Sequence, residues 1–376
     1  MRLGDHIDIL SGFAFKSKQF NTKGKGIQVV RIRDVGKEKS ETHYEGEYKA
    51  DYILNDGDLL IGMDGDFRLA EWNGGRALLN QRVCKITVSS NDLYRNYLMR
   101  MLPRELKRIE DTTSFATVKH LSVKKINDID FPLPPLDQQK KIAAILDAAD
   151  DCRQKTKSLI AKYDELTQSL FLDMFGELEG DKVSLSSICE VNPKKSQISS
   201  LDRSLKVSFV PMTNVSEEGG LSLVEERTID EVWSGFTYFQ ENDVVFAKIT
   251  PCMENGKGTI MRGLKNEIGF GTTEFHVLRP TNEVSCSEYL FYLTHSSHFR
   301  VLAELNMKGS AGQKRVPKDF FDRYKVVAPS IALQNQFAER VQAIEAQKVQ
   351  AQASLVQAED LFSSLLQRAF KGELIN

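Results

Sequence analysis

The stretch that decides the fold reads Phe131-Pro-Leu-Pro-Pro-Leu-Asp-Gln-Gln-Lys-Lys-Ile-Ala-Ala-Ile-Leu-Asp147. Its prolines favour an extended chain, because each proline pushes the residue before it out of the helical region. After Pro135 neither proline nor glycine occurs until Gly176. The run between them predicts one continuous helix of about forty residues, about 60 Å long at 1.5 Å per residue.

The same signal recurs 195 residues further on. Pro329-Ser-Ile-Ala-Leu-Gln-Asn-Gln-Phe337 repeats the pattern of Pro134-Pro-Leu-Asp-Gln-Gln-Lys-Lys-Ile142, and a second uninterrupted run follows to Gly372. Two long helices, each preceded by a globular segment, indicate an internal duplication. The second signal keeps only Pro329, so we expect the corner before the second helix to be looser.

Apolar or small side chains recur along both runs at alternating steps of three and four residues. This is the spacing of a coiled-coil seam, and it predicts that the two helices pair with each other. The predicted helix–helix residues are Ile142, Ile145, Ala149, Leu159 and Leu166 in the first run and Phe337, Val341, Ile344, Leu355 and Phe362 in the second.

The repeat divides the 376 residues into four parts, enough for two domains with cores of their own. Globular domains are predicted at 1–133 and 177–330, with spacer helices at 134–176 and 331–376. Both globular parts carry strand-like and then helix-like stretches in the same order. These are 27–33, 58–62 and 93–110 in the first part, and 207–215, 243–249 and 289–305 in the second. The predicted class is α+β, with two α/β domains in a tandem repeat.

Composition narrows the functional classes. No apolar run is long enough to cross a bilayer, and the first residues lack the apolar stretch of a signal peptide. The five cysteines are odd in number and scattered, without a Cys-x-x-Cys pair, which disfavours a disulfide framework or a zinc site. A protein of the reducing cytoplasm is therefore expected. Net charge is −2, with 22 basic and 19 acidic side chains in 1–133 but 18 and 21 in 177–330. Any DNA contact must therefore come from local clusters of charge.

Signatures of catalysis are weak. The sequence contains no phosphate-binding loop and no dinucleotide-binding glycine motif. Asn192-Pro-Lys-Lys lacks the aromatic residue expected in an amino-methyltransferase loop, and His276 fits a satisfied, half-buried histidine better than a base. Asp56, Asp58, Asp64 and Asp66 could hold Mg²⁺, which keeps a self-contained metal-dependent DNA nuclease as an alternative hypothesis. Support of tight Asp-Gly turns is the simpler interpretation of these aspartates.

Polar loops in both globular parts carry the side-chain types that bond base edges and phosphates. For any one residue a solvated loop is an equally good interpretation, but as a set at matching positions in two repeats they favour DNA. A pure coiled-coil scaffold would leave the two loop-diverse domains without a role. The candidate DNA-binding residues are Lys16, Lys18, Arg33, Arg68, Asn73, Arg76, Asn80, Arg82, Thr117 and Lys119 in the first part, and Lys194, Lys195, Thr213, Asn214, Lys248, Thr250, Met253, Asn255, Lys257, Thr272, Thr273, Gln313, Lys314 and Arg315 in the second.

Several of these features together resemble one known family, the specificity subunits of type I restriction–modification systems. They are Pro132-Leu-Pro-Pro-Leu-Asp-Gln-Gln139 with the helix behind it, the closing Leu366-Gln-Arg-Ala-Phe-Lys-Gly-Glu-Leu374, and the repeated order of domain and helix. The stretch 64–84 resembles one type of target-recognition domain, and the stretch 246–257 together with 271–277 resembles another. The resemblance covers nearly the whole chain.

The resemblance implies a non-catalytic DNA reader without a cofactor of its own. Two target-recognition domains would each read one half of a bipartite, asymmetric site, about one helical turn or roughly 34–36 Å apart. The two long helices would form an antiparallel coiled coil, and the exposed faces of 137–175 and 333–371 would dock two modification subunits. Those subunits methylate adenine, and motor-nuclease restriction subunits join them on double-stranded DNA.

Overall fold

The computed structural model describes residues 1–113, 119–222, 224–310 and 312–375. Its contacts divide the chain into two compact units: unit 1 is Met1–Thr156 with Ser354–Asn376, and unit 2 is Lys157–Ala353. Each unit therefore contains one globular part together with one end of each long helix. The sequence-based boundaries had treated the helices as separate segments.

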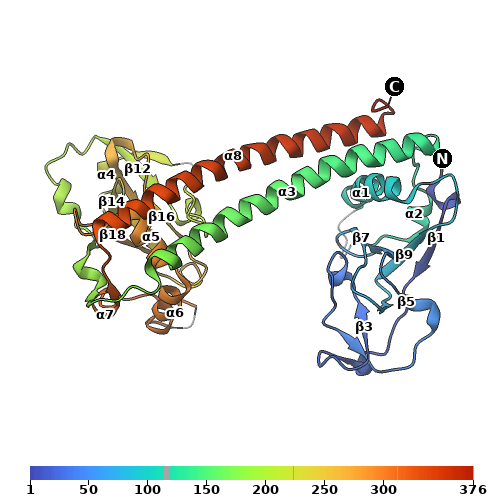
Figure 1. Cartoon of the computed structure of the whole chain (residues 1–376), viewed down its shortest axis with the longest axis horizontal. Helices are drawn as coiled ribbons and strands as arrows, with labels where there is room; N and C mark the ends of the chain where they lie inside the picture. Colours follow the sequence, from blue (N-terminus) through green and yellow to red (C-terminus); the bar gives the residue numbers. More distant parts are fainter. Residues whose placement is uncertain (114–118, 223, 311, 376) are drawn as a thin grey trace. The chain divides into compact units, whose positions relative to one another are not determined.

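Unit 1 holds a four-stranded antiparallel sheet in the order β1-β9-β6-β7 and a five-stranded sheet in the order β2-β4-β3-β8-β5. In the second sheet β3 and β8 run parallel. The elements of unit 1 (Figure 1) are β1 Ile7–Ser11, β2 Phe20–Asn21, β3 Ile27–Val30, β4 His43–Tyr44, β5 Ile53–Leu54, β6 Leu59–Gly62, β7 Leu69–Glu71, β8 Ala77–Leu79, β9 Val83–Val88, α1 Arg95–Thr112 and α2 Val123–Asn127.

Unit 2 repeats this topology. Its antiparallel sheet has the order β11-β18-β15-β16, and its second sheet, β13-β12-β17-β14, again has a parallel central pair. A short pair, β10 and β19, is added. The elements are β10 Lys182–Ser184, β11 Cys189–Val191, β12 Lys206–Val210, β13 Glu225–Thr228, α4 Ile229–Val232, β14 Thr237–Gln240, β15 Val244–Ala247, β16 Gly258–Ile260, β17 Ile268–Gly271, β18 Phe275–Pro280, α5 Ser287–His295, α6 Ser297–Leu305, α7 Phe320–Arg323 and β19 Lys325–Val327.

The two predicted long helices are α3, Leu136–Phe175, and α8, Ile331–Phe370, each of 40 residues (green and red in Figure 1). In unit 1 the first turns of α3 and the last turns of α8 share a core that contains Leu146 and Ala369. In unit 2 the last turns of α3 pack on the first turns of α8, with the rings of Phe171 and Phe337 5.6 Å apart. Opposite ends meet in both units, so the helices pair antiparallel.

A buried glutamine fixes the start of α3. Gln139 is 0% exposed, and its amide oxygen accepts a hydrogen bond from Tyr94 N at 2.8 Å. Its amide nitrogen donates to Asp92 O and to Pro134 O, both at 2.7 Å. These bonds join the proline-rich corner, the first turn of α3 and the segment that leads into α1.

Gln334 makes the same set of bonds at the start of α8. It is also 0% exposed, accepts from Cys286 N at 3.0 Å and donates to Val284 O and Pro329 O, both at 2.9 Å. The expectation of a looser second corner is therefore wrong, because the glutamine bonds hold this corner with a single proline as they hold the first.

The predicted seam needs correction on α3. Of its five predicted residues, Ile142 is buried and Ala149 half-buried, whereas Ile145, Leu159 and Leu166 are 37%, 44% and 50% exposed. The covered positions are instead Leu146, Arg153, Ile160 and Thr167, one residue further along. The spacing of apolar residues predicted the wrong side of α3 because two of the covered positions, Arg153 and Thr167, carry polar side chains. On α8, Phe337 and Val341 are buried, and Ile344, Leu355 and Phe362 are half-buried.

Shorter elements also differ from expectation. The predicted strands at 27–33 and 207–215 end early, and each is followed by one turn of 3-10 helix, Ile32–Asp34 and Met212–Asn214. The helix predicted at 289–305 is two helices, because Ser296 is extended (φ −62°, ψ 143°) and its hydroxyl accepts a hydrogen bond from Phe299 N at 3.2 Å. A serine in this position caps the second helix.

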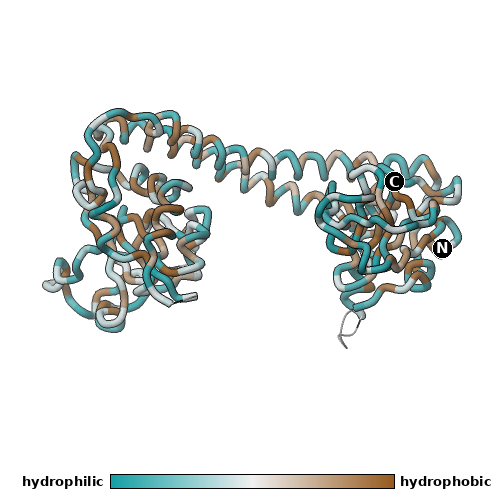
Figure 2. The backbone as a smooth tube through the Cα atoms, turned by 90° about the horizontal axis from the view of Figure 1, so that it is seen from below, coloured by the Kyte–Doolittle hydropathy of each residue, from teal (hydrophilic) through white to brown (hydrophobic). Residues whose placement is uncertain are grey.

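Hydrophilic residues recur along both long helices in Figure 2. Among the helices of the described residues, none combines the length and the apolar character that crossing a lipid bilayer requires.

His276 on β18 is a buried, fully bonded histidine. It is 3% exposed, its Nε2 donates to Val316 O at 2.8 Å, and its Nδ1 accepts from Asn192 Nδ2 at 3.1 Å. Burial lowers the pKa of His276 from 6.5 to about 4, so the ring is neutral in the folded chain at neutral pH. Its role is structural, as the sequence suggested.

The glutamine bonds predict an asymmetry between two neighbouring residues. Gln139→Met leaves buried backbone groups without partners and should destabilise unit 1 by about 2 kcal/mol. Gln138→Met, at an exposed site one residue earlier, should change stability little. Urea unfolding followed by the fluorescence of Trp72, which is buried in unit 1, measures both in a Trp233→Phe background. Equal midpoints for the two variants would show that the glutamine bonds do not stabilise the corner.

The lowered pKa of His276 predicts a loss of stability in mild acid. Below pH 6.5 the unfolded chain takes up a proton at this histidine, whereas the folded chain does so only near pH 4. This contribution to stability is therefore present above pH 6.5 and lost as pH falls toward 4. Between pH 7.5 and 5.0 the wild type should lose about 2 kcal/mol more than His276→Gln. Urea unfolding at both pH values tests this, with His298→Gln, at an exposed site on α6, as the matched control.

Candidate nucleic-acid interface

The same backbone junction occurs in both units. In unit 1 it joins the end of β6, the start of β9 and the segment before α2: Met63 N donates to Arg82 O at 3.0 Å, and Leu121 N donates to Met63 O at 2.7 Å. We call residues 63–65, 82 and 119–121 the junction of unit 1. It brings together candidate residues that lie far apart in the sequence.

The junction of unit 2 consists of residues 248–250, 274 and 314–316. Lys248 N donates to Glu274 O at 2.8 Å, and Val316 N donates to Lys248 O at 2.9 Å. A third bond is also repeated, from Gly65 N to Lys119 O at 2.8 Å in unit 1 and from Thr250 N to Lys314 O at 3.0 Å in unit 2. Bond by bond, Arg82 corresponds to Glu274 and His120 to Arg315.

Asp64 organises the side chains at the junction of unit 1. Its Oδ1 lies 2.7 Å from His120 Nδ1, and its Oδ2 lies 3.0 Å from Arg82 Nη1. The carboxylate is 19% exposed, whereas its two partners are 55% and 56% exposed. A shallow recess of about 260 Å³ beside it is also lined by Arg33 and Arg68. The result is a solvent-facing group of three arginines, Arg33, Arg68 and Arg82, beside the half-buried carboxylate of Asp64, with Asp66 on the same recess.

Glu274 organises the junction of unit 2. Arg315 donates from Nε to Glu274 Oε2 and from Nη2 to Glu274 Oε1, both at 2.8 Å. The hydrogen bond from this guanidinium holds the pKa of the Glu274 carboxyl below its ordinary value. Lys248 is half-buried beside the pair, and burial lowers the pKa of its ammonium group. Gln313 and Lys314 are exposed.

Most of the other candidate residues are accessible. Arg33, Arg68 and Arg82 keep 56%, 61% and 56% of their side-chain surface. The remaining exposed candidates are Lys16, Lys18, Asn73, Arg76, Lys194, Thr213, Asn255 and Thr273, and the half-buried ones are Lys119, Lys195, Asn214, Thr250, Lys257 and Thr272. Thr117 lies outside the described residues.

Two candidates are corrected by the structure. Asn80 is 6% exposed at the end of β8, where its backbone pairs with Phe13. Met253 is 2% exposed and belongs to the hydrophobic core of unit 2. Neither side chain can reach DNA without rearrangement of its unit, because both are packed inside it. Loop position in the sequence did not reveal this burial.

Not all candidates gather at the junctions. Lys195 donates to Trp233 O, and Asn255 donates to Glu217 at 2.9 Å, so these two are occupied within unit 2. In unit 1, Arg76 lies with Lys39 along a separate groove of about 670 Å³ at the five-stranded sheet.

The sequence analysis missed three side chains of the junctions: Asp64 as an organising acid, its partner His120, and Glu274. One signal could have found His120. The triplet Lys119-His120-Leu121 stands 195 residues before Lys314-Arg315-Val316, at the same offset as the two helix starts.

The four aspartates considered for Mg²⁺ each face a partner of their own. Asp64 and Asp66 line one recess, but Asp64 binds Arg82 and His120, and Asp66 lies 3.8 Å from Arg68 Nη2. Asp58 lies 3.6 Å from Lys85 Nζ, and Asp56 accepts from Gly75 N at 2.7 Å. Within residues 1–113, 119–222, 224–310 and 312–375, no group of three or more His, Cys, Asp or Glu side chains is placed to hold a metal ion. This arrangement gives the nuclease alternative no support.

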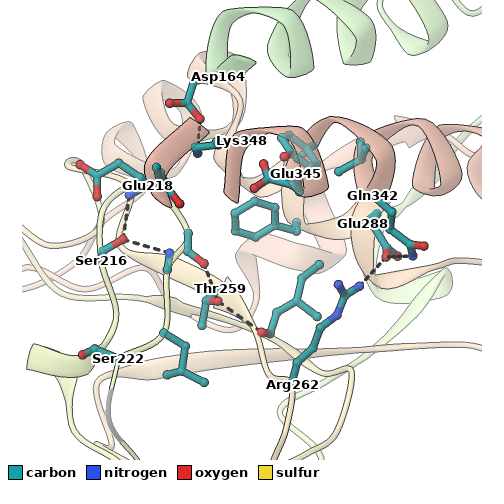
Figure 3. A pocket seen from close by; sticks show the side chains of 18 of the residues that line it. Asp164, Ser216, Glu218, Ser222, Thr259, Arg262, Glu288, Gln342, Glu345 and Lys348 are labelled. Carbon is teal, nitrogen blue, oxygen red and sulfur yellow. Dashed lines mark hydrogen bonds and ion pairs between the residues drawn. The ribbon is translucent and has the colours of Figure 1, made fainter. Parts of the chain in front are cut away.

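A recess of about 990 Å³ in unit 2 lies between α3, α5, α8, β16 and the segment 216–222, with Val224 (Figure 3). Two ion pairs cross its wall, Lys348 with Asp164 and Arg262 with Glu288. Glu218 and Glu345 add two further acids to the lining. Acids outnumber bases here, so the recess is a poor site for a polyanion, and the junction of unit 2 is the better candidate for DNA.

A family model described as the type I restriction modification DNA specificity domain matches residues 1–163 and 178–355. The type I restriction enzyme EcoBI specificity subunit of Escherichia coli is 46% identical over 140 residues, 37% of this chain and 30% of that relative. The EcoEI specificity subunit, from the same species, is 42% identical over 148 residues, 39% of this chain and 24% of that relative. These matches span less than a third of either relative.

A more distant relative aligns over a longer stretch. The type I restriction enzyme MjaVIII specificity subunit of Methanocaldococcus jannaschii is 22% identical over 322 residues, 78% of this chain and 73% of that relative.

Solved structures support the fold. The S subunit of the type I restriction–modification system of M. genitalium has a TM-score of 0.54 at 14% identity, covering 98% of this chain and 95% of its own. A chain from a study of complex assembly and conformational transition of the type I R-M system has a TM-score of 0.58 at 14% identity, covering 100% and 97%. At this identity the likeness concerns the fold alone. Because the family model matches most of the chain in two segments, this protein belongs to the type I restriction–modification DNA specificity family.

Proposed function

We propose that this chain is the non-catalytic, DNA-recognising subunit of a type I restriction–modification complex. Each unit would read one half of a bipartite, asymmetric site in double-stranded DNA. The observation that carries this proposal is the duplicated junction: one backbone geometry occurs twice, with exposed cations in both copies and different side chains at corresponding positions. Two similar backbone arrangements that carry different side chains would suit two half-sites of different sequence.

The candidate residues divide into two roles under this proposal. Accessible side chains at and beside the junctions, such as the exposed Arg82 and Lys314 and the half-buried Lys119, would contact base edges or the nearest phosphates. Outlying lysines, such as Lys16 and Lys18, would contact phosphates, which position the protein without reading sequence. The remaining accessible candidates named above belong to one or the other group.

We further propose that α3 and α8 dock two modification subunits. On α3 the side chains that do not enter the seam, Ile145, Leu159 and Leu166, stand whole heptads apart and form one exposed apolar stripe. On α8, Val349 and Val356 are 61% and 59% exposed, also one heptad apart. Apolar stripes on long helices are the pattern that partner helices recognise.

The docked modification subunits would supply adenine methylation, and restriction subunits would add DNA translocation and cleavage. Because the target is the host's own DNA and that of invaders, we place the complex in the cytoplasm.

Replacing residues 1–133 with the corresponding part of another specificity subunit should change one half of the recognised site and leave the other half intact. The reason is that each junction is built within a single unit. Sequencing of methylated adenines in a host that expresses the hybrid with its modification subunits measures this. An unchanged site, or a change in both halves, would contradict one domain per half-site. Cutting of plasmid by the purified chain with Mg²⁺ alone would favour the nuclease alternative.

Leu159→Gln together with Leu166→Gln should weaken co-purification with the modification subunits by about tenfold or more, because two exposed apolar anchors are lost. Helicity and thermal stability of the free chain should hardly change, since neither side chain is in the seam. Lys162→Gln, also exposed on α3, is the control. Undiminished assembly of the double variant would rule out the stripe as the docking surface.

A further inference from the structure

Arg315 was predicted to contact DNA, yet three N–H groups of its guanidinium already donate hydrogen bonds within unit 2. Of its five N–H groups, Nε and one N–H of Nη2 bind the two oxygens of Glu274, and Nη1 donates to Gln313 O at 3.0 Å. The Nε–Nη2 edge is one of the guanidinium edges that can make a bidentate contact with a base. Reading a base with this edge would require breaking two charge-assisted hydrogen bonds.

Arg315 instead bonds to the loop that immediately precedes it. Its backbone exchanges two hydrogen bonds of 2.9 Å with Lys308, which brings residues 308–310 and 312–315 together as a loop, of which these residues are described. Within the loop, Gln313 N donates to Ser310 O at 3.0 Å, and the Arg315 side chain binds Gln313 O from outside. Thr250 N, on the neighbouring segment, donates to Lys314 O. Gln313 and Lys314 project from this framework and are exposed.

We propose that Glu274 is a positioning residue for DNA recognition by unit 2. It fixes Arg315, Arg315 holds Gln313 and the backbone of residues 312–315 in place, and Gln313 and Lys314 make the contacts with the half-site. Ordering the loop before DNA binds lowers the entropy cost of recognition. This inference rests on the proposed function and adds to it which residues of the loop read DNA and which one prepares them.

Unit 1 carries a comparable arrangement built from the other strand. There the organising acid is Asp64, which follows β6, and it holds both Arg82 and His120. Glu274 precedes β18 instead, at the position that corresponds to Arg82. A half-buried acid that binds the basic side chains nearby therefore occurs at each junction, although the two acids stand at different positions of the shared backbone.

Two opposite expectations make the idea testable. Removing an acid next to DNA normally raises affinity, because repulsion of the phosphates falls. If Glu274 positions the loop, Glu274→Ala should instead weaken binding by about tenfold or more, the usual size for loss of a charged hydrogen-bonded pair. Glu304→Ala, at an exposed acid on α6, measures the bulk electrostatic effect alone and should leave affinity equal or slightly higher.

The experiment uses the complex of the full chain with its modification subunits and a duplex that carries the site found by methylation sequencing. Affinities are measured for Glu274→Ala, Arg315→Ala, the double alanine variant, and the charge-reversed pair Glu274→Arg with Arg315→Glu. Duplexes with single-base changes in either half-site are included. Gln313→Ala with Lys314→Ala completes the set.

The positioning role predicts that both single alanine variants lose about the same affinity and that the double variant loses no more than either. The charge-reversed pair should recover most of it. Discrimination should fall only in one half-site, and Gln313→Ala with Lys314→Ala should abolish it there.

A Glu274→Ala complex that binds as well as wild type, with Arg315→Ala impaired, would overturn the inference and make Arg315 the reader. Loss of discrimination in both half-sites equally would overturn it as well, since it would show a general defect. If the wild-type complex itself shows no preference between the site and altered duplexes, the proposed function fails, which is a distinct result. Thermal unfolding of each variant identifies loss of folding, and in that case the charge-reversed pair decides the matter.

Discussion

Two buried glutamine side chains fix the corners at which the globular parts join the long helices. Gln139 and Gln334 are both completely buried, and each satisfies one backbone N–H and two backbone carbonyls in the corner where a globular part meets a long helix. The bonds fix the direction in which each helix leaves its domain. Buried backbone groups that lost these partners would cost more than the bonds themselves contribute, so the constraint tolerates little variation.

The two units share a backbone arrangement but carry different side chains on it. Both units share a four-stranded antiparallel sheet, a second sheet with a parallel pair of strands, and the same three hydrogen bonds at the junction. Yet a cation in one unit, Arg82, corresponds to an anion in the other, Glu274. Backbone bonds make this possible, because a frame built from N–H and C=O groups leaves its side chains free to differ. The same frame can thus carry two different reading surfaces.

The contact between the two long helices includes polar as well as apolar side chains. Arg153 lies over the ring of Phe362 at 4.4 Å, and Lys348 pairs with Asp164. Charged side chains such as Arg153 and Lys348 occupy covered positions, whereas the apolar side chain of Leu159 is exposed. A helix surface of this kind buries little of its apolar area within the chain itself, which is consistent with helices that bind partners.

The sequence by itself determined the duplication, the extent of both helices to within two residues of the flanking prolines and glycines, the α+β class and the family. These depend on proline, glycine and periodicity, which act locally along the chain. Tertiary structure alone decided which side of α3 faces α8, that Asn80 and Met253 are buried, and that Asp64 and Glu274 each bind partners distant in sequence. Burial and ion pairing are set by strands that meet from distant parts of the chain, and no local pattern records which side chains those strands bring together.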